Sequence, residues 1–488
     1  MIRRRKTEDG RGCRPERVKM QQIKKKNLTE GPLFWRMLLF ALPIIATGVL
    51  QICYSMADNI VVGQFSGDPN ALGAVGSTSS LTNLTVNLLF GIAGGASVVI
   101  AQSFGAGDDE VVSRTVHTAL GFSLVGGLFF GLLGLLLARP ALTLMGTRPT
   151  LLEGAVLYFS IICIGIPANS VYNMGASILR SVGDSKTPLI ILASTGLGNV
   201  GLNFVFVLGF GMSVAGVAIA TIAAQYLSAI AVILVLWHRR DLNYGFHPKR
   251  MCFDKALFLR ILRFGLPAGI QGSLFSLSNV LLTSGVNSLG DHVIKAYTIA
   301  NNIDAITFTA CNSFHQTALT FVGQNYGARK YSRIRRAMLF VLLQVTFFGI
   351  VIAQAELLFS RPLSELYVAA DDPNREEIIL LARQIMEVLL NTYFLCGLMD
   401  VLSGILKGLG YSLTPMLVSL SGICGLRVLW VLFIFPMERM HTHVGLCLSY
   451  PVSWVVTGLL HFVTAIFALR KLRRMERGMI SDPAAQIT

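Results

Sequence analysis

An aspartate inside an apolar segment is the first candidate functional residue of this sequence. Asp58 is the one acidic residue in the segment 34–62. A charged side chain at the centre of a membrane-spanning helix costs about 2.5–3.5 kcal/mol on insertion scales, so such residues are usually functional. Asn199 and Asn203 lie together in a later apolar segment, and Thr221 lies in the next one. These side chains offer one carboxylate and three neutral oxygens.

The depth of these four residues predicts that they meet. With a helical rise of 1.5 Å per residue, Asp58, Asn203 and Thr221 lie about 9–12 Å below the same membrane surface, and Asn199 lies one turn deeper. Such oxygen ligands suit a hard cation, and the same surroundings could control protonation of the carboxylate. We predict a site for H⁺ or Na⁺ here, with hydrogen bonds that only pack the helices as the alternative. Beyond that coupling ion, no metal and no cofactor is expected.

The second half of the chain places further charges within apolar segments. Asp400 and Arg427 are expected to pair across neighbouring helices, because lone charges in a membrane seek partners. Asp304 is expected to line a central cleft, where it would attract a cationic substrate.

Polar side chains along the first, second, seventh and eighth apolar segments are candidates for contact with a substrate. Phe and Met residues accompany them, and flexible apolar walls with a few polar groups suit loose recognition of flat organic compounds. The predicted cleft residues are Gln51, Tyr54, Asn59, Asn87, Gln271, Ser276, Asn279 and Asp304.

The elements that must position these residues are membrane-spanning helices. Of the 488 residues, 53% are hydrophobic and 14% are charged, and the mean hydropathy is +0.62, whereas an ordinary globular chain is about 25% charged. A run of about 20 apolar residues crosses a bilayer as a helix. Twelve runs are predicted, of which the second and eighth are the most polar, at about 34–62, 73–101, 115–138, 153–178, 187–210, 213–237, 258–286, 294–322, 335–359, 378–405, 413–435 and 444–469.

The net charge of +15 is explained by an excess of Lys and Arg on one side of the membrane. An even number of spans places both termini on one side, and most Lys and Arg residues lie in the tails and loops of that side. The positive-inside rule therefore predicts cytoplasmic termini in a multi-pass cell-membrane protein, not a nucleic-acid-binding protein. The basic N-terminal tail shows no signal-peptide cleavage site, and Met20 is a second candidate start. The eight cysteines contain no Cys-x-x-Cys pair, so they indicate neither a disulfide framework nor a metal site.

Three motifs recur in the same order in the two halves of the chain. They are ILRSVGDSKTP at 178–188 and ILKGLGYSLTP at 405–415, QSFGA at 102–106 and QNYGA at 324–328, and Leu42-Pro43 and Leu266-Pro267. Six spans per copy predict parallel repeats, which form two lobes around a central cleft. The motif at 178–188 and 405–415 predicts a tight turn between two helices, with a structural role.

We therefore predict an all-α integral membrane protein of twelve transmembrane helices in two six-helix lobes. The predicted divisions are a basic N-tail (1–31), an N-lobe (32–237), a cytoplasmic linker (238–257), a C-lobe (258–470) and a C-tail (471–488).

Several residues and motifs of the chain resemble those of a known family, the MATE (multidrug and toxic compound extrusion) transporters. The similar features are Pro43 followed by Gln51, Tyr54, Asp58 and Gly63, the Gly-Gln-Asn-Tyr-Gly-Ala stretch at 323–328, and the Leu-Arg-x-x-Gly-x-x-x-x-Pro turn ending at Pro188. The resemblance extends from about Asn27 to Arg474 and covers nearly the whole chain.

This resemblance implies export of organic, often cationic compounds in exchange for Na⁺ or H⁺. It also implies an ion site at Asp58, Asn199 and Thr221. Many relatives have a second carboxylate at the position of Asn203, so its absence here makes proton coupling the favoured expectation.

The sequence thus predicts a secondary active multidrug exporter that works as a monomer by alternating access. The alternative is a lipid-linked saccharide flippase of the same superfamily. Such a protein would hold a pyrophosphate with basic residues of its cleft, but no Lys or Arg lies between Met37 and Arg114 or between Phe264 and Leu289. No His-Glu-x-x-His, Gly-x-Ser-x-Gly or Walker motif occurs, so neither a membrane enzyme nor an ATP-driven pump is expected.

Overall fold

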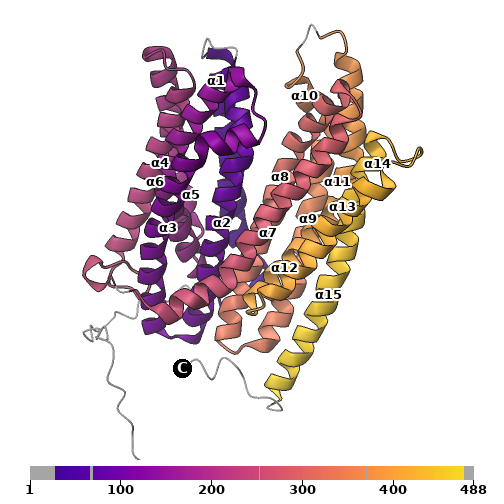
Figure 1. Cartoon of the computed structure of the whole chain (residues 1–488). Helices are drawn as coiled ribbons and strands as arrows, with labels where there is room; N and C mark the ends of the chain where they lie inside the picture. The colour runs from indigo at the N-terminus through magenta and orange to yellow at the C-terminus, as the bar shows by residue number, and fades with distance from the viewer. Residues whose placement is uncertain (1–27, 66–69, 252, 370–371, 478–488) are drawn as a thin grey trace, which may run out of the picture.

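The computed structural model describes residues 28–65, 70–251, 253–369 and 372–477, and all regular structure within these ranges is helical (Figure 1). The α-helices are α1 (Leu33–Phe65), α2 (Ala71–Ala106), α3 (Asp109–Leu144), α4 (Pro149–Ser181), α5 (Lys186–Phe204), α6 (Val214–His238), α7 (Lys255–Asn287), α8 (Asp291–Gly327), α9 (Tyr331–Leu358), α10 (Ser360–Glu365), α11 (Arg375–Gly408), α12 (Leu413–Ser419), α13 (Leu426–Leu429), α14 (His443–Cys447) and α15 (Ser449–Glu476). Short π-helices at Val205–Gly209, Leu420–Gly425 and Trp430–Ile434 extend α5, α12 and α13, and Pro248–Arg250 is a 3₁₀ turn.

Within the described residues, ten helical segments are long and apolar enough to cross a membrane. The helices α7 and α8, with 33 and 37 residues, are long enough but more polar. The ten segments together with α7 and α8 make the twelve spans predicted from the sequence. The predicted polarity of the eighth span, α8, is confirmed. The second span, α2, was also predicted to be polar, but it is apolar enough to cross a membrane, whereas the seventh span, α7, falls short of that hydropathy.

The helices form two groups that diverge from one end of the molecule (Figure 1). One group contains α1–α6, and the other contains α7–α15. The lobe boundaries stay a prediction, but two helix ends differ from it: α7 begins at Lys255, inside the predicted linker, and α15 continues to Glu476, inside the predicted C-tail.

Both ends of the described chain lie beside the α8–α9 turn. The backbone N–H of Leu28 donates to Oε1 of Gln324 at 3.1 Å, and Arg335 pairs with Glu476 at 2.8 Å. We call this end of the molecule the terminal side.

Glycine pairs let α2 and α7 cross at backbone contact between the two groups. A Cβ atom added at Gly91 would overlap the backbone of Gly269, and one added at Gly95 would overlap Gly265. Each helix therefore presents a Gly-x-x-x-Gly pair to the other, the arrangement that allows close packing of helices in lipid.

The repeated Gln-x-x-Gly motifs make a second, reciprocal contact on the terminal side. Gln102 Nε2 donates to the carbonyl of Gly408 at 3.0 Å, and Gln324 Nε2 donates to the carbonyl of Ser181 at 2.6 Å. Each acceptor ends a helix of the opposite group, where backbone carbonyls lack intrahelical partners. The repeat seen in the sequence therefore holds the two groups together.

The turns after these carbonyls depend on glycine. Gly183 and Gly410 have φ angles of +95° and +91°, a region that residues with a Cβ atom rarely adopt. These glycines end α4 and α11 and turn the chain towards α5 and α12.

Candidate functional site

The carboxylate of Asp58 accepts hydrogen bonds from two other helices. Asn203 Nδ2 of α5 donates to Oδ1 at 2.5 Å, and Thr221 Oγ1 of α6 lies 3.2 Å from Oδ2. The same hydroxyl lies 2.9 Å from the Val217 carbonyl, and its single hydrogen serves one acceptor at a time. The structure thus brings together three of the four residues predicted for the ion site.

Asn199 is buried but donates no hydrogen bond to Asp58 within the described residues. It lies one helical turn from Asn203, as the sequence spacing predicted. Asn199 therefore lies beside the group formed by Asp58, Asn203 and Thr221 but does not belong to it.

The surroundings of the carboxylate are apolar. Five valines from α1, α6 and the π-helical end of α5 pack into one buried cluster, and Tyr158 of α4 lies against it. These valines are Val61, Val62, Val207, Val214 and Val217. A carboxylate in such surroundings requires a proton, a cation or a full set of hydrogen-bond donors.

The oxygen atoms at this site suit a small cation. Asn203 is fully buried, and its Oδ1 atom has no hydrogen-bond partner. This carbonyl oxygen, the two Asp58 oxygens and the Thr221 hydroxyl are ligands that a hard ion such as Na⁺ prefers. A proton needs fewer ligands, because it binds to the carboxylate alone.

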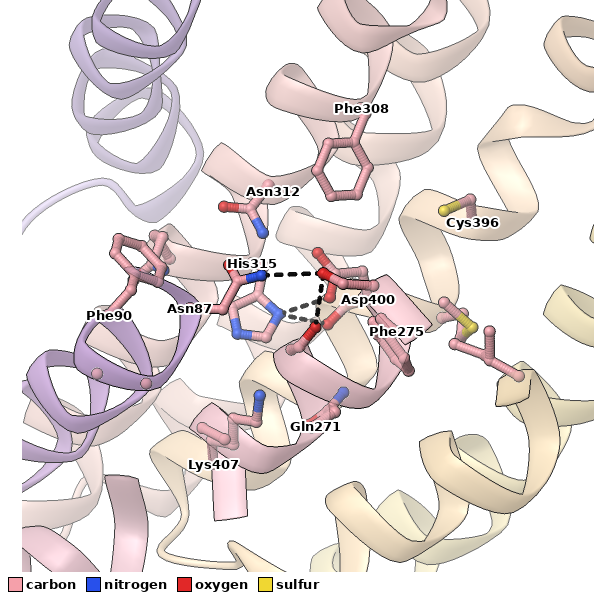
Figure 2. Close-up of a pocket in the computed structure, with 18 of the residues that line it drawn as sticks. Asn87, Phe90, Gln271, Phe275, Phe308, Asn312, His315, Cys396, Asp400 and Lys407 are labelled. Atoms are coloured by element: carbon pink, nitrogen blue, oxygen red, sulfur yellow. Dashed lines mark hydrogen bonds and ion pairs between the residues drawn. The ribbon is translucent and has the colours of Figure 1, made fainter. Parts of the chain in front are cut away.

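A cavity of about 620 Å³ lies mainly between α7, α8 and α11 (Figure 2). Five predicted cleft residues line it: Asn87, Gln271, Ser276, Asn279 and Asp304. Asn87 Nδ2 of α2 donates to Ser276 Oγ of α7 at 3.2 Å, which joins the two groups of helices at the cavity wall.

A second cavity of about 430 Å³ adjoins the first and is lined largely by α1. The predicted residues Gln51 and Asn59 line it, and Phe90 and Phe308 line both cavities. Tyr54 lies in neither cavity. Its hydroxyl donates to the Ala193 carbonyl at 3.2 Å, and its ring fills the space beside Gly196 on α5.

The predicted pair of Asp400 with Arg427 is wrong. Asp400 Oδ1 instead lies 2.9 Å from Nδ1 of His315, which also lies 2.8 Å from the Asp400 backbone carbonyl. Since that carbonyl only accepts, Nδ1 carries the hydrogen. Figure 2 shows this pair at the wall of the first cavity. Sequence reasoning missed His315, although a histidine within a membrane span was the available signal.

Arg427 has uncharged partners. Its Nε donates to Ser453 Oγ at 3.2 Å, and its guanidinium lies 4.1 Å from the centre of the Tyr450 ring. A guanidinium over an aromatic face is held by the electrostatics of the ring. The residue therefore faces the first cavity as a cation without a carboxylate partner among the described residues.

Comparison with known proteins places the chain among transporters. The sequence model of the MatE family matches residues 43–205 and 267–432, once in each half. The probable multidrug resistance protein YoeA of Bacillus subtilis (strain 168) is 28% identical over 447 residues, which cover 90% of this chain and 95% of the relative. The probable multidrug resistance protein NorM of Thermotoga maritima is 27% identical, covering 80% of this chain and 82% of the relative.

The fold also matches solved structures. One is described as the outward-facing conformation of a multidrug resistance MATE family transporter of the MOP superfamily. It aligns with a TM-score of 0.84 at 20% identity, covering 93% of this chain and all of the other. The two matched halves and the shared helical fold show that this chain belongs to the MATE family of membrane transporters.

Proposed function

We propose that the chain is a secondary active exporter that moves organic, drug-like compounds outward in exchange for H⁺ or Na⁺ bound at Asp58. One observation carries this proposal: a membrane-embedded carboxylate is held by side chains of two neighbouring helices and lies next to a cavity-lining residue of its own helix. The names of the relatives, multidrug resistance proteins, support the same class of transport. They also favour an exporter over the flippase alternative.

The helix α1 connects the ion site to the substrate cavity. Asp58 contacts α5 and α6, while Asn59 and Gln51 of the same helix face the second cavity. Farther along α1, a Cβ atom at Gly48 would overlap the Thr309 side chain of α8, so α1 also touches the opposite group of helices. A rearrangement of α1 would therefore change the ion site and the cavity together.

Pro43 supplies a place where α1 can bend. It lies inside the helix, and proline removes one backbone hydrogen bond and disturbs the turn before it. Neutralising Asp58 with a cation changes the hydrogen bonds that hold α1 to α5 and α6. We infer that this event shifts the balance between outward- and inward-facing states, because a ligand shifts an equilibrium by its difference in affinity for the two states.

Proton coupling is the favoured form of this mechanism. The site has one carboxylate, and Asn203 adds an amide in place of a second negative charge. Either ion would neutralise one carboxylate, but a proton needs that group alone, whereas Na⁺ also needs the neutral oxygens of Asn203 and Thr221.

The terminal side is proposed to face the cytoplasm of a cell-membrane protein that acts as a monomer. Leu28 and Glu476 lie at the same end of the molecule, and the basic residues of the tails and loops on that side favour a cytoplasmic location. Labelling of single cysteines placed at Ser332 and Leu144, in intact cells, tests this orientation.

Efflux of a fluorescent dye from vesicles tests the proposed function. The purified protein is reconstituted, and a pH gradient or a Na⁺ gradient is imposed separately. The wild type is expected to drive efflux with the pH gradient, and Asp58→Asn is expected to abolish it. Asp291→Asn, which removes an exposed carboxylate at the start of α8, is the matched control. Gradient-driven efflux by Asp58→Asn at the wild-type rate would refute the role of Asp58.

A further inference from the structure

A buried carboxylate that the ion site at Asp58 does not use lies in the group α7–α15. Glu356, near the end of α9, is 6% exposed. Its Oε1 atom accepts a hydrogen bond from the backbone N–H of Thr307 on α8 at 3.1 Å, and its Oε2 atom accepts one from the Thr307 hydroxyl at 2.8 Å. Thr307 is itself fully buried. The carboxylate of Glu356 is therefore fixed against one turn of α8.

Asp304 lies on the same turn of α8. It precedes Thr307 by three residues, and side chains three residues apart on a helix lie on one face, with about 5–6 Å between their Cβ atoms. The charges of Asp304 and Glu356 interact, and both interact with the phenol of Tyr393 on α11. Three packed helices thus bring two carboxyl groups close together.

Neither carboxyl group forms an ion pair with any residue that the structure describes. Of the other charged groups that line the first cavity, His315 and Lys407 interact with Asp400, and the guanidinium of Arg427 lies over the Tyr450 ring. Two like charges that are buried close together without a cation destabilise each other. One carboxyl group of such a pair therefore holds a proton.

Hydrogen bonds distinguish the two carboxyl groups. Glu356 accepts two hydrogen bonds from Thr307, and donors of this kind stabilise the charged form of a carboxylate. Asp304 accepts no side-chain hydrogen bond within the described ranges. Asp304 also lines the first cavity, from which a proton can reach it, whereas Glu356 lies outside the described lining. The proton is therefore assigned to Asp304, with Glu356 as its ionised neighbour.

We propose that Asp304 binds an exchangeable proton, and that the negative charge of Glu356 holds this proton on Asp304. The pair is a second proton site, in the group of helices that does not contain Asp58. The inference rests on the proposed function in one respect, because this proton would be a second coupling ion. Each exported molecule would then be exchanged for two protons.

Infrared difference spectroscopy of the purified full-length protein in lipid nanodiscs tests the site without a transport assay. A protonated carboxyl group has a C=O stretching band that shifts in D₂O and that a carboxylate lacks. All spectra are taken at pH 7 in the Asp58→Asn background, so that Asp58 does not contribute. We expect this band in the background protein and its loss on Asp304→Asn. Asp291→Asn, which removes an exposed carboxylate at the start of the same helix, should leave the band unchanged.

Substitution of Glu356 separates the effect of its charge from the effect of burial. Glu356→Gln removes the like charge and should weaken proton binding at Asp304 about a hundredfold, as Coulomb's law gives for charges about 6 Å apart at an effective dielectric of 20. Glu356→Asp keeps the charge and should keep most of the infrared band. Titration of the band from pH 9 to pH 4 provides the measurement.

Two infrared results would overturn the inference. A band that survives Asp304→Asn would show that the proton is bound elsewhere. Unchanged proton binding in Glu356→Gln would show that burial alone holds the proton and that the two carboxyl groups do not act as a pair.

The dye gradient that vesicles sustain tests the coupling. With the membrane potential held at zero, each exchanged proton supports about a tenfold dye gradient per pH unit. The wild type is expected to reach about a hundredfold, and Asp304→Asn about tenfold. Equal gradients in the two proteins would contradict the coupling role of Asp304.

Failure of this inference is distinguishable from failure of the proposed function. An infrared band that depends on Asp304, without gradient-driven efflux by the wild type, would support the proton site and refute the exporter. Efflux driven by a pH gradient, in a protein without this band, would refute the second site alone.

Discussion

At the residue scale, Asn203 decides which ion suits the Asp58 site. Its side chain donates one hydrogen bond to Asp58 and leaves a buried carbonyl oxygen without a partner. Asn203→Asp would place a second carboxylate there. Two unit charges 4 Å apart interact by about 4 kcal/mol at an effective dielectric of 20, so the pair should favour a bound cation strongly.

We expect Asn203→Asp to make dye efflux from vesicles dependent on Na⁺, with about a tenfold increase in rate on Na⁺ addition. Asn203→Ala, which adds no charge, is the control and should show no such dependence. Equal responses to Na⁺ in the two variants would contradict the assignment of Asn203 to the ion site.

Asp184 shows what a paired carboxylate does outside the membrane spans. It lies in the turn between α4 and α5 and accepts from Arg239 at 2.8 Å and from the Thr187 hydroxyl at 2.6 Å. Burial alone would raise the pKa of Asp184, but the hydrogen bonds from Thr187 and Arg239 hold it below its usual value. A carboxylate whose pKa is depressed by folding stabilises the protein above its unfolded-state pKa and loses this contribution as the pH falls.

Asp184→Asn should therefore lower the free energy of unfolding at pH 7 by about 1 kcal/mol. The difference between wild type and variant should shrink as the pH falls below about 4, the usual range of an aspartate pKa. Melting temperatures of the detergent-solubilised proteins from pH 7 to pH 3 provide the measurement. A difference that stays constant over this range would show that the ion pair contributes nothing.

At the element scale, the crossing of α2 and α7 requires glycine at particular positions. A Cβ atom at Gly91 would overlap the backbone of Gly269, whereas one at Gly94 would meet no atom within 4 Å. Overpacking of a tight contact costs about 1–3 kcal/mol. Gly91→Ala should therefore lower both the melting temperature and the efflux rate, while Gly94→Ala on the same helix, where the added Cβ atom faces the first cavity, should leave the melting temperature unchanged. Equal effects of the two substitutions would indicate a general loss of helix flexibility instead.

The reciprocal glutamines should hold the terminal side closed. Each hydrogen bond contributes about 0.5–1.5 kcal/mol, so the double variant Gln102→Ala, Gln324→Ala should increase the inward-open population about tenfold or more. Spin labels at Lys186 and Ser332, in a cysteine-free background, report the separation of the two groups on the terminal side. We expect longer distances in the double variant, with Gln354→Ala, which removes a bond to the Asn391 side chain within one group of helices, as the control. An unchanged distance distribution would exclude the proposed clamp.

At the scale of the whole molecule, the sequence predicted what depends on periodicity and composition. Long apolar runs predict spans because every backbone polar group in a bilayer must be satisfied within a helix. The depths of Asp58, Asn203 and Thr221 followed from the helical rise alone, and these residues do contact one another. The repeated motifs were also visible in the sequence. The sequence did not show that the glutamines of these motifs form hydrogen bonds across the two groups of helices.

Contacts between distant helices could not be predicted in the same way. Asp400 pairs with His315 and not with Arg427, because the rotation of each helix about its axis selects the partner. Arg427 was recognised as a charge within a span, but its place at the wall of the first cavity depends on the same rotation and was not predicted.

The central claim is that ion occupancy of Asp58 decides which side of the molecule opens. Spin labels at Leu144, the last residue of α3, and Leu366, the residue after α10, measure this opening directly in nanodiscs, because both are exposed and they belong to opposite groups. In the wild type, the distance distribution should shift between two populations as the pH changes from 8 to 5. Asp58→Asn should remain in one population at every pH, and a pH-dependent shift in that variant equal to the wild type would contradict the account.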